Sequence, residues 1–304
     1  MQGVGLRGDR ATVPWAAVPP THVDSTDGVR VAVHDLGGPA DPGAPVLLFS
    51  HATGFHGRAW APMASHLTDR FRCLAIDYRG HGVSVTPDVV DFHWQGFGDD
   101  CVSVLDSGLV PAGAEVHGVG HSMGGAALVK AASRRPGAVR SLWLYEPIVP
   151  PPGAPLSSDG PNPMAAGAAK RRPDFDSYEA AIENYASKPP LDELHPDALR
   201  AYVEGGFERR TDGSVTLRCR PEWEAATFDA ARHSGAWDLL GGLDLPVSVV
   251  SGKELAAGPA SFAPHIADAL PWGQLSIHPE LGHFGPLQDP EAMAAELAGW
   301  VTQL

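Results

Sequence analysis

The chain has 304 residues, of which 43% are hydrophobic, so it is long enough for one large domain with an insertion or for two modest domains. Its formal net charge is −14 and its longest basic run is Lys170-Arg171-Arg172, which makes nucleic acids and anionic membranes poor partners. No segment approaches the roughly 18 consecutive apolar residues of a membrane span, and Cys73, Cys101 and Cys219 form an odd, sparse set that argues against a disulfide framework, so we expect a cytoplasmic protein. The composition leaves the oligomeric state open.

The beginning of the chain predicts an arm followed by a β-hairpin. Residues 1–22 contain charged side chains but no apolar core of a signal peptide, so we interpret them as an N-terminal arm. Between residues 23 and 36, Thr26-Asp27-Gly28 has the composition of a turn, and apolar residues alternate with less apolar ones after it.

Short, continuous apolar runs and helical patterns then alternate along the chain. The runs span residues 46–49, 73–76, 116–119, 142–145, 247–250 and 275–277. Helices are predicted near residues 57–69, 93–107, 123–135, 259–270 and 290–303. Because runs that are apolar on both faces belong to a buried parallel sheet, the pattern predicts an α/β fold with a mostly parallel central sheet flanked by helices.

One long interval interrupts this alternation. Residues 147–245 begin with several prolines and then show helical patterns near 176–187, 196–210 and 221–233. We interpret them as a helical cap domain inserted into a core of residues 23–146 and 246–304, because the β/α alternation resumes afterwards. A second, independent domain is the alternative.

The most informative motif is the run Gly-His-Ser-Met-Gly at residues 120–124. A β-prone stretch precedes it and a helix-forming stretch follows it, which is the context of a G-x-S-x-G nucleophile elbow. The sharp turn strains the serine backbone and requires small neighbours on either side. Ser122 is therefore the predicted nucleophile.

A general base is expected after the last strand, in a loop at the carboxyl edge of the sheet, where open α/β folds place their sites. His283 lies in this loop and follows both the serine and every plausible acid in chain order. The oxyanion hole is expected from the backbone N–H groups of Met123 and Thr53, with Ala52 as the neighbouring register.

Together these motifs resemble the α/β-hydrolase family over nearly the whole chain, from about residue 23 to the end. The matching segments are residues 51–55, the Asp-Tyr-Arg-Gly-His-Gly-Val-Ser run at 77–84, the elbow at 120–124, and Gly-His-Phe at 282–284. The resemblance implies the α/β-hydrolase fold and acyl transfer through a serine. We interpret the run at 77–84 as structural.

The acid of the triad departs from the usual pattern. The family keeps it after the strand that follows the cap, about three residues past a glycine, and that slot holds Leu255, with Glu254 one residue early. Glu146 ends the strand before the cap instead and is followed by proline. We favour Glu146 over Glu254 as the residue that orients His283.

This Ser-Glu-His order, with the acid before the cap, is similar to that of the zearalenone lactonases within the family. The resemblance implies a lactone in a bulky macrocycle, although a shared triad does not fix a substrate. A general carboxylesterase, a cofactor-free perhydrolase or C–C hydrolase, and a ligand receptor without turnover are the alternatives.

The substrate is expected to be a hydrophobic small molecule, because the predicted cap is rich in aromatic residues. These are Tyr202, Phe207, Trp223 and Phe228. Trp223 is the preferred contact, through its indole N–H, and Phe55 beside the oxyanion loop is the second. No metal or cofactor is expected, since no H-E-x-x-H motif or close His/Asp cluster occurs.

Overall fold

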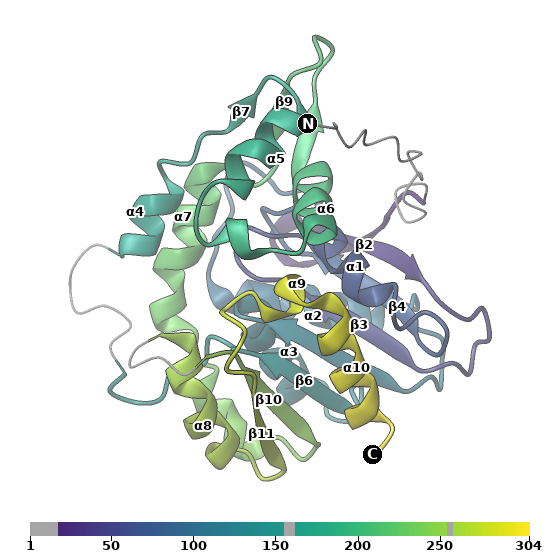
Figure 1. The fold of residues 1–304 in the computed structure, drawn as a ribbon. Helices are drawn as coiled ribbons and strands as arrows, with labels where there is room; N and C mark the ends of the chain where they lie inside the picture. The colour runs from purple at the N-terminus through teal and green to yellow at the C-terminus, as the bar shows by residue number, and fades with distance from the viewer. Residues whose placement is uncertain (1–17, 155–161, 254–257) are drawn as a thin grey trace, which may run out of the picture.

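The computed structural model describes residues 18–154, 162–253 and 258–304 and is built around one eight-stranded sheet (Figure 1). The strand order is β1-β2-β4-β3-β5-β6-β10-β11. In chain order the strands are β1 (Thr21–Asp24), β2 (Arg30–Gly37), β3 (Val46–Ser50), β4 (Arg72–Asp77), β5 (Val116–His121), β6 (Ser141–Tyr145), β10 (Val247–Ser251) and β11 (Gly273–Ile277). Strand β2 pairs antiparallel with β1 and β4, and the other neighbours are parallel. This arrangement is the predicted fold class.

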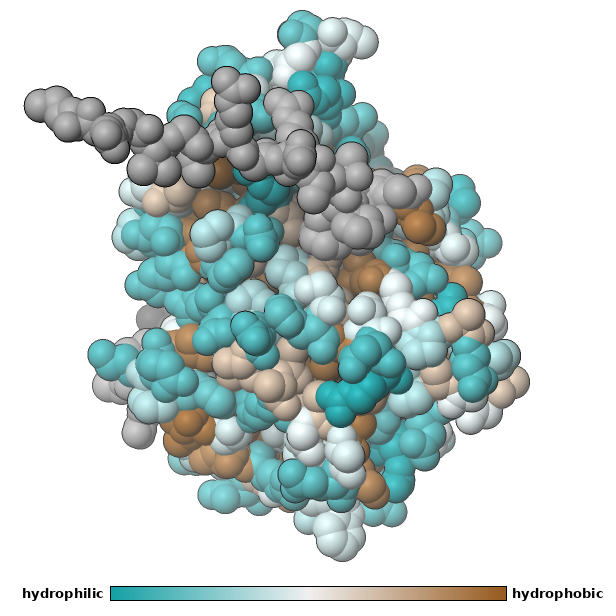
Figure 2. Space-filling model, turned by 45° about the vertical axis from the view of Figure 1, so that its right-hand side comes forward, coloured by the Kyte–Doolittle hydropathy of each residue, from teal (hydrophilic) through white to brown (hydrophobic). Residues whose placement is uncertain are grey.

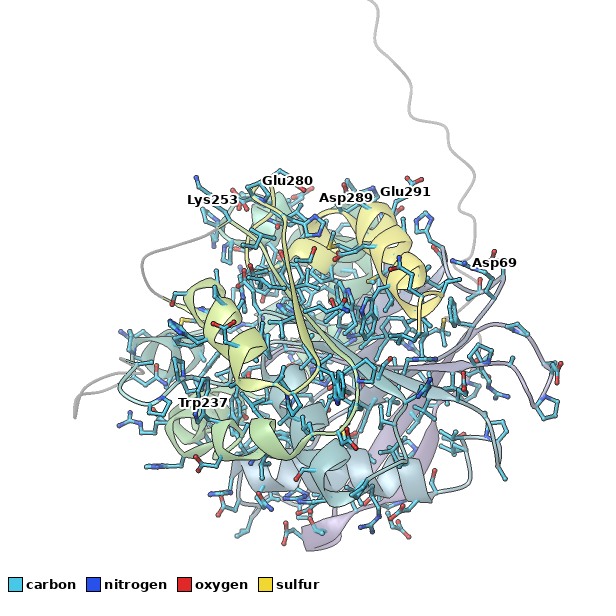
Figure 3. All side chains as sticks on the ribbon, turned by 90° about the horizontal axis from the view of Figure 1, so that it is seen from below. Asp69, Trp237, Lys253, Glu280, Asp289 and Glu291 are labelled. Carbon is cyan, nitrogen blue, oxygen red and sulfur yellow. The ribbon has the colours of Figure 1, made fainter. Side chains whose placement is uncertain are left out.

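The central strands match the apolar runs because they are covered on both faces. Every residue of β3, β5, β6 and β10 is buried. Helices α2 (Trp94–Asp106), α3 (Met123–Arg134) and α8 (Pro259–Ala269) share one apolar core with one face of the sheet. Helices α1 (Ala61–Ala64) and α10 (Pro290–Val301) cover the other face. The Asp289 side chain caps α10 by accepting the Ala292 N–H at 3.0 Å (Figure 3).

The helix predicted for residues 57–69 is wrong in length. The chain forms a 3₁₀ turn, η3 (Gly57–Trp60), and then the single turn of α1. A continuous helix from Gly57 would place Pro62 in its interior, where proline removes a hydrogen bond and clashes with the preceding turn. The helix therefore starts anew at Ala61, with Pro62 in its first turn.

The segment between β6 and β10 is called the cap insertion (residues 147–245). None of its described residues joins the central sheet, in which β6 and β10 pair directly. Its helices are α4 (Pro163–Ala168), α5 (Tyr178–Ala186), α6 (Pro196–Gly206) and α7 (Pro221–Ala230), with 3₁₀ turns η4 (Leu191–Glu193), η5 (Ala231–His233) and η6 (Trp237–Gly242). It also holds a small antiparallel sheet that the sequence did not predict, formed by β7 (Asp174–Phe175), β9 (Val215–Leu217) and β8 (Phe207–Arg209). Because α6 ends at Gly206, the helix predicted to residue 210 is too long.

The cap insertion packs on the carboxyl edge of the sheet, above the central strands in Figure 1. Phe55 and Ala59 of the core share an apolar cluster with Tyr202 of α6 and with Leu287 of α9 (Gly285–Gln288). The outer surface carries hydrophilic residues with scattered hydrophobic ones (Figure 2). None of the helices in the described ranges is both long and apolar enough to cross a bilayer.

Candidate active site

Ser122 lies on a strained turn between β5 and α3. Its φ of 55° and ψ of −119° are unusual for a residue other than glycine, and such strain costs about 1–3 kcal/mol. The turn is held because the Ser122 N–H donates to Tyr145 O at 3.0 Å and Ser122 O accepts the Ile148 N–H at 3.1 Å. This local geometry is the one that the G-x-S-x-G motif predicts.

The two glycines of the motif are required by close packing. A Cβ on Gly120 would lie 2.7 Å from the Gly125 Cα, and one on Gly124 would lie 2.3 Å from Ser50 O. These distances are below any normal contact, so a larger residue would displace β3 or α3. The hydroxyl of Ser122 is consequently fixed at the positive end of α3.

Glu146 and His283 lie together at the carboxyl edge of the sheet. The Nδ1 atom of His283 is 2.6 Å from Glu146 Oε2, and the second carboxylate oxygen accepts the Gly252 N–H at 2.9 Å. Since an ionised carboxylate only accepts, Nδ1 carries the hydrogen and Nε2 keeps a lone pair. The arrangement leaves Nε2 free to take a proton.

The backbone at Glu146 is also strained. Its φ is 40°, and the residue is only 2% exposed. Two backbone bonds frame it: its N–H donates to Val250 O, and the preceding residue Tyr145 accepts the N–H of Ser122. Strain at a buried carboxylate, held from two strands, is typical of functional sites.

The backbone of the His283 loop is anchored to the elbow strand β5 and to the neighbouring strand β6. His121 Nε2 donates to His283 O at 2.7 Å, and the Tyr145 hydroxyl donates to Gly282 O at 2.7 Å.

Among the described residues, the Ser122 hydroxyl has no hydrogen-bond partner, and no hydrogen bond joins it to His283. Such contacts are often long without substrate and tighten only in the complex.

Three backbone N–H groups near Ser122 are candidates for the oxyanion hole. Among the described residues, the N–H groups of Thr53 and Met123 have no hydrogen-bond acceptor, and the same holds for Ala52. Thr53 is 8% exposed and Met123 is fully buried. Both registers that the sequence left open therefore remain possible donors.

Two buried histidines hold the loop that carries Thr53. Gly54 N–H donates to His81 Nε2 at 3.1 Å, and Tyr78 N–H donates to His51 Nε2 at 3.1 Å. Each ring donates its single N–H hydrogen, from Nδ1, to a backbone carbonyl. Burial lowers the pKa of His81 and lowers the pKa of His51 well below its ordinary value, so both rings are neutral acceptors for these N–H groups.

The run at residues 77–84 contributes structure, as the sequence indicated, and also carries His81. Asp77 is buried and accepts hydrogen bonds from the His34 ring and from the N–H groups of Gly57 and Val83, at 2.7–2.8 Å. These bonds fix the run beside the oxyanion loop. The sequence missed the role of His81 because it assigned no chemistry to this motif.

Phe55 and Trp223, the predicted substrate contacts, lie in different surroundings. The Phe55 ring is 4.7 Å from Tyr202 and 5.2 Å from Phe284, the neighbour of His283. Trp223 instead packs against Phe92, with the Arg220 guanidinium 4.2 Å above its ring. The structure brings Phe55 into contact with the neighbour of the base, whereas Trp223 packs against Phe92 of the core and Arg220 of the cap insertion.

A charged pair that the sequence did not single out covers the oxyanion loop from the cap insertion. Arg171 Nη1 donates to Glu224 Oε2 at 2.5 Å. A Cβ on Gly54 would lie 2.4 Å from Glu224 Oε1 and 3.3 Å from Arg171 Nη1, so only glycine fits beneath the pair. The sequence named Arg171 only as part of the longest basic run, Lys170-Arg171-Arg172, and assigned it no role in the site.

Three expectations from the sequence remain to be placed: the second candidate acid, the N-terminal arm and the absence of a metal site. Glu254, the other acid considered, and residues 1–17 of the arm lie outside the described residues. Within the described ranges, no three His, Cys, Asp or Glu side chains are grouped so that they could hold a metal ion, and Cys73, Cys101 and Cys219 are buried free thiols.

Comparisons with known proteins agree with the fold. A sequence model of the alpha/beta hydrolase family matches residues 47–296. The 2-(acetamidomethylene)succinate hydrolase of Mesorhizobium japonicum is 28% identical over 216 residues, which are 69% of this chain and 70% of that protein. A crystal structure of an E-2-(acetamidomethylene)succinate hydrolase superposes with a TM-score of 0.73 at 22% identity, over 93% of this chain and 98% of the other. The enol-lactonase from Burkholderia xenovorans gives 0.68 at 20% identity, over 93% and 100%.

The family match covers most of the chain and includes the elbow and His283. The chain therefore belongs to the alpha/beta hydrolase family and is a hydrolase. The specific resemblance to zearalenone lactonases is not shown by these comparisons.

Proposed function

For this member of the alpha/beta hydrolase family, we propose that Ser122, His283 and Glu146 cleave a carboxylic ester or lactone through an acyl-enzyme. The observation that carries the proposal is the 2.6 Å bond between His283 Nδ1 and Glu146 Oε2, at the sheet edge that also carries the strained Ser122. A structural role alone does not require an imidazole with a free Nε2 at this edge.

In the first step, the Ser122 hydroxyl gives its proton to His283 Nε2 while its oxygen forms a bond to the substrate carbonyl carbon. The carbonyl oxygen becomes an oxyanion and accepts the N–H groups of Met123 and Thr53, each worth roughly 3–4 kcal/mol when well aimed. The C–O bond then breaks, and the alcohol leaves with the proton from His283.

In the second step, water gives a proton to His283 and attacks the acyl carbon. The carboxylic acid leaves, and the proton returns to Ser122. Glu146 keeps the Nδ1 hydrogen in place and stabilises the imidazolium in both steps.

Cleavage of an acyl C–N bond is the second candidate, and a specific observation favours it. The relative that covers 69% of the chain is named a 2-(acetamidomethylene)succinate hydrolase, a name that contains an acetamido group. The same steps serve an amide, with His283 protonating a nitrogen instead of an oxygen. A macrolactone of the zearalenone type is the most specific form of the ester proposal, and it is supported by the position of Glu146.

A substrate screen tests the proposal. Purified protein is incubated with aryl esters, alkyl lactones, zearalenone and acetanilides, and separately with a fluorophosphonate probe. We expect turnover of at least one ester or lactone, and labelling that maps to Ser122. No turnover in any class together with no labelling would instead support a ligand receptor on the same fold.

A further inference from the structure

The cap insertion places two phenols on the charged pair above the oxyanion loop. Arg171 Nη2 donates to the hydroxyl oxygens of both Tyr185, at 3.0 Å, and Tyr202. The two rings meet edge to face, with centroids 5.6 Å apart. The guanidinium of Arg171 therefore bonds to three side chains. We call Arg171, Glu224, Tyr185 and Tyr202 the cap polar cluster.

Among the described residues, the hydroxyl groups of both tyrosines serve only as acceptors. Each phenol oxygen accepts from Arg171, so its own O–H must donate elsewhere. Over the described part of the chain, neither O–H has an acceptor. Tyr202 is only 2% exposed, and a buried donor without an acceptor costs about 1–3 kcal/mol.

The charge balance of the cap polar cluster explains how it tolerates burial. Arg171 and Glu224 are 17% and 8% exposed at their side chains and neutralise each other. Breaking a buried pair of this kind is strongly destabilising, so the guanidinium stays in place. The pair holds the phenols without using their O–H groups.

The location of the cap polar cluster links it to the reaction. A Cβ built on Gly54, the residue after Thr53, would lie closest to the Glu224 carboxylate, and Arg171 Nη1 is the next nearest group. The Tyr202 ring contacts Phe55, which contacts Phe284 beside His283. Tyr185 is half-buried, so solvent reaches the cluster from its side.

We propose that the O–H groups of Tyr185 and Tyr202 bind an oxygen acceptor on the acyl portion of the substrate, namely a carboxylate or a carboxamide carbonyl. Two donors fixed on one guanidinium match the two oxygens of a carboxylate or the two lone pairs of a carbonyl. This inference rests on the proposed function, and it changes the expected substrate from a purely hydrophobic molecule to one with a polar end.

The test uses 4-nitrophenyl esters whose acyl chains end in a methyl group, a carboxamide or a carboxylate, each at several chain lengths. Release of nitrophenolate gives kcat/KM for the wild type and for the double variant Tyr185→Phe/Tyr202→Phe. The measured quantity is the ratio of kcat/KM for each polar chain to that for the methyl chain of equal length. Comparing the two polar arms identifies whether the acceptor is charged.

We expect the wild type to prefer one polar chain at one length, and the double variant to lose roughly tenfold of that preference, the size of one net hydrogen bond. Tyr178→Phe is the matched control, because Tyr178 lies on the same helix α5 but its hydroxyl faces Phe207 O at 3.4 Å. It should leave the ratio within about twofold.

Two results would overturn the inference while leaving the proposed function intact: a wild type without polar preference that still hydrolyses the methyl-chain esters, or an unchanged ratio in the folded double variant. Thermal unfolding verifies that the variant is folded. If removal of the buried Tyr202 hydroxyl prevents folding, the single variant Tyr185→Phe, at the half-buried ring, gives the same comparison.

Discussion

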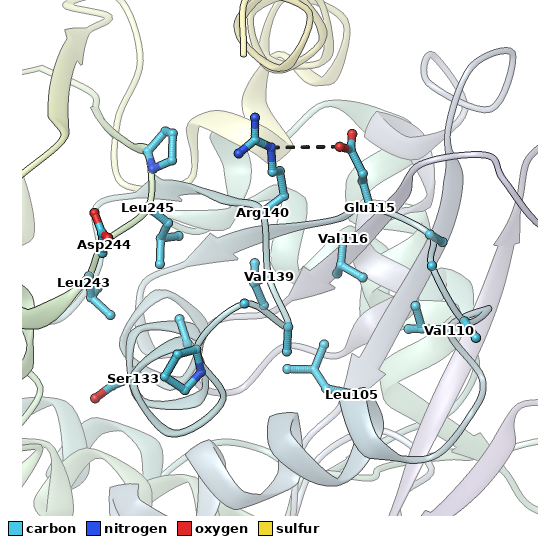
Figure 4. Close-up of a pocket in the computed structure, with 18 of the residues that line it drawn as sticks. Leu105, Val110, Glu115, Val116, Ser133, Val139, Arg140, Leu243, Asp244 and Leu245 are labelled. Atoms are coloured by element: carbon cyan, nitrogen blue, oxygen red, sulfur yellow. Dashed lines mark ion pairs between the residues drawn. The ribbon is translucent and has the colours of Figure 1, made fainter.

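The two edges of the central sheet differ, because the larger hollow is at one edge and the reactive side chains are at the other. At the amino edge, the loops before β5, β6 and β10 surround a depression of about 700 Å³, lined by apolar residues such as Val116 and Val139 and bordered by the ion pair of Arg140 and Glu115 (Figure 4). At the carboxyl edge, the cavity behind the oxyanion loop measures only about 10 Å³. Yet the strained residues Ser122 and Glu146 and the pair of Glu146 with His283 are at the carboxyl edge, so the chemistry of the side chains locates the site and the size of a hollow does not.

Replacement of the nucleophile gives the largest expected effect and tests whether the carboxyl edge carries the active site. We expect Ser122→Ala to lower turnover by about 10⁴–10⁶-fold, because loss of a nucleophile removes the whole covalent route. Ser133→Ala, at the depression on the amino edge, should change turnover by less than about twofold. Initial rates on the best ester from the screen measure both, and similar rates for the two variants would refute the assignment.

The acid gives the next largest effect. Glu146→Gln keeps the shape of the side chain but removes the charge behind His283, and we expect a loss of roughly 10³–10⁴-fold in kcat. Glu115→Gln at the amino edge is the matched control and should have no measurable effect on kcat.

Glu254→Ala is measured beside these two variants, since Glu254 was the other acid that the sequence allowed. A large loss of kcat in Glu254→Ala alone would move the acid to the strand after the cap insertion. A loss confined to Glu146→Gln would fix it after β6.

Most of the core fold could be predicted from the sequence, because the central strands are buried on both faces and leave continuous apolar runs such as residues 46–49 and 247–250. The small sheet of the cap insertion could not, since its strands have only two or three residues and show no periodicity. Pro62 argues against a long helix at 57–69, but the hydrophobic pattern on which that prediction rested takes no account of proline.

The residues of the site also fall into those that the sequence predicts and those that only the fold brings together. Ser122 and His283 follow from short motifs and chain order, which are properties of the sequence itself. The pairing of Glu146 with His283 depends on the strand order β6-β10-β11, because Glu146 follows β6 and His283 follows β11, and this order is a tertiary fact. Arg171 reaches the oxyanion loop, and Tyr185 reaches Arg171, only through the fold of the cap insertion, and no local pattern distinguishes them from surface residues.

The histidines of the carboxyl edge predict a smaller, pH-dependent effect. Burial lowers the pKa of His51, His81 and His121, and lowers that of His56 to about 4. A base whose pKa is lower in the folded state binds its proton preferentially when unfolded, so stability falls as the pH drops below about 6.5. Each such histidine contributes up to about 1.4 kcal/mol per pH unit in that window.

Urea unfolding at pH 7, 6 and 5 measures this dependence. We expect the free energy of unfolding to decrease steadily toward pH 5, and His81→Gln to reduce the slope by the share of one proton. A free energy that stays constant from pH 7 to pH 5 would show that these rings are not neutral and buried as the carboxyl edge requires.

The smallest effect is expected at the amino edge itself. Arg140 Nε and Glu115 Oε1 are 3.9 Å apart, and their side chains are 50% and 65% exposed. Exposed pairs of this kind contribute less than about 1 kcal/mol, so Arg140→Ala should change the free energy of unfolding by about 0.5 kcal/mol or less and leave kcat/KM within about twofold. Chemical denaturation and initial rates measure both quantities. A tenfold loss of turnover would mean that the 700 Å³ depression takes part in the reaction, and that the distinction between the two edges is wrong.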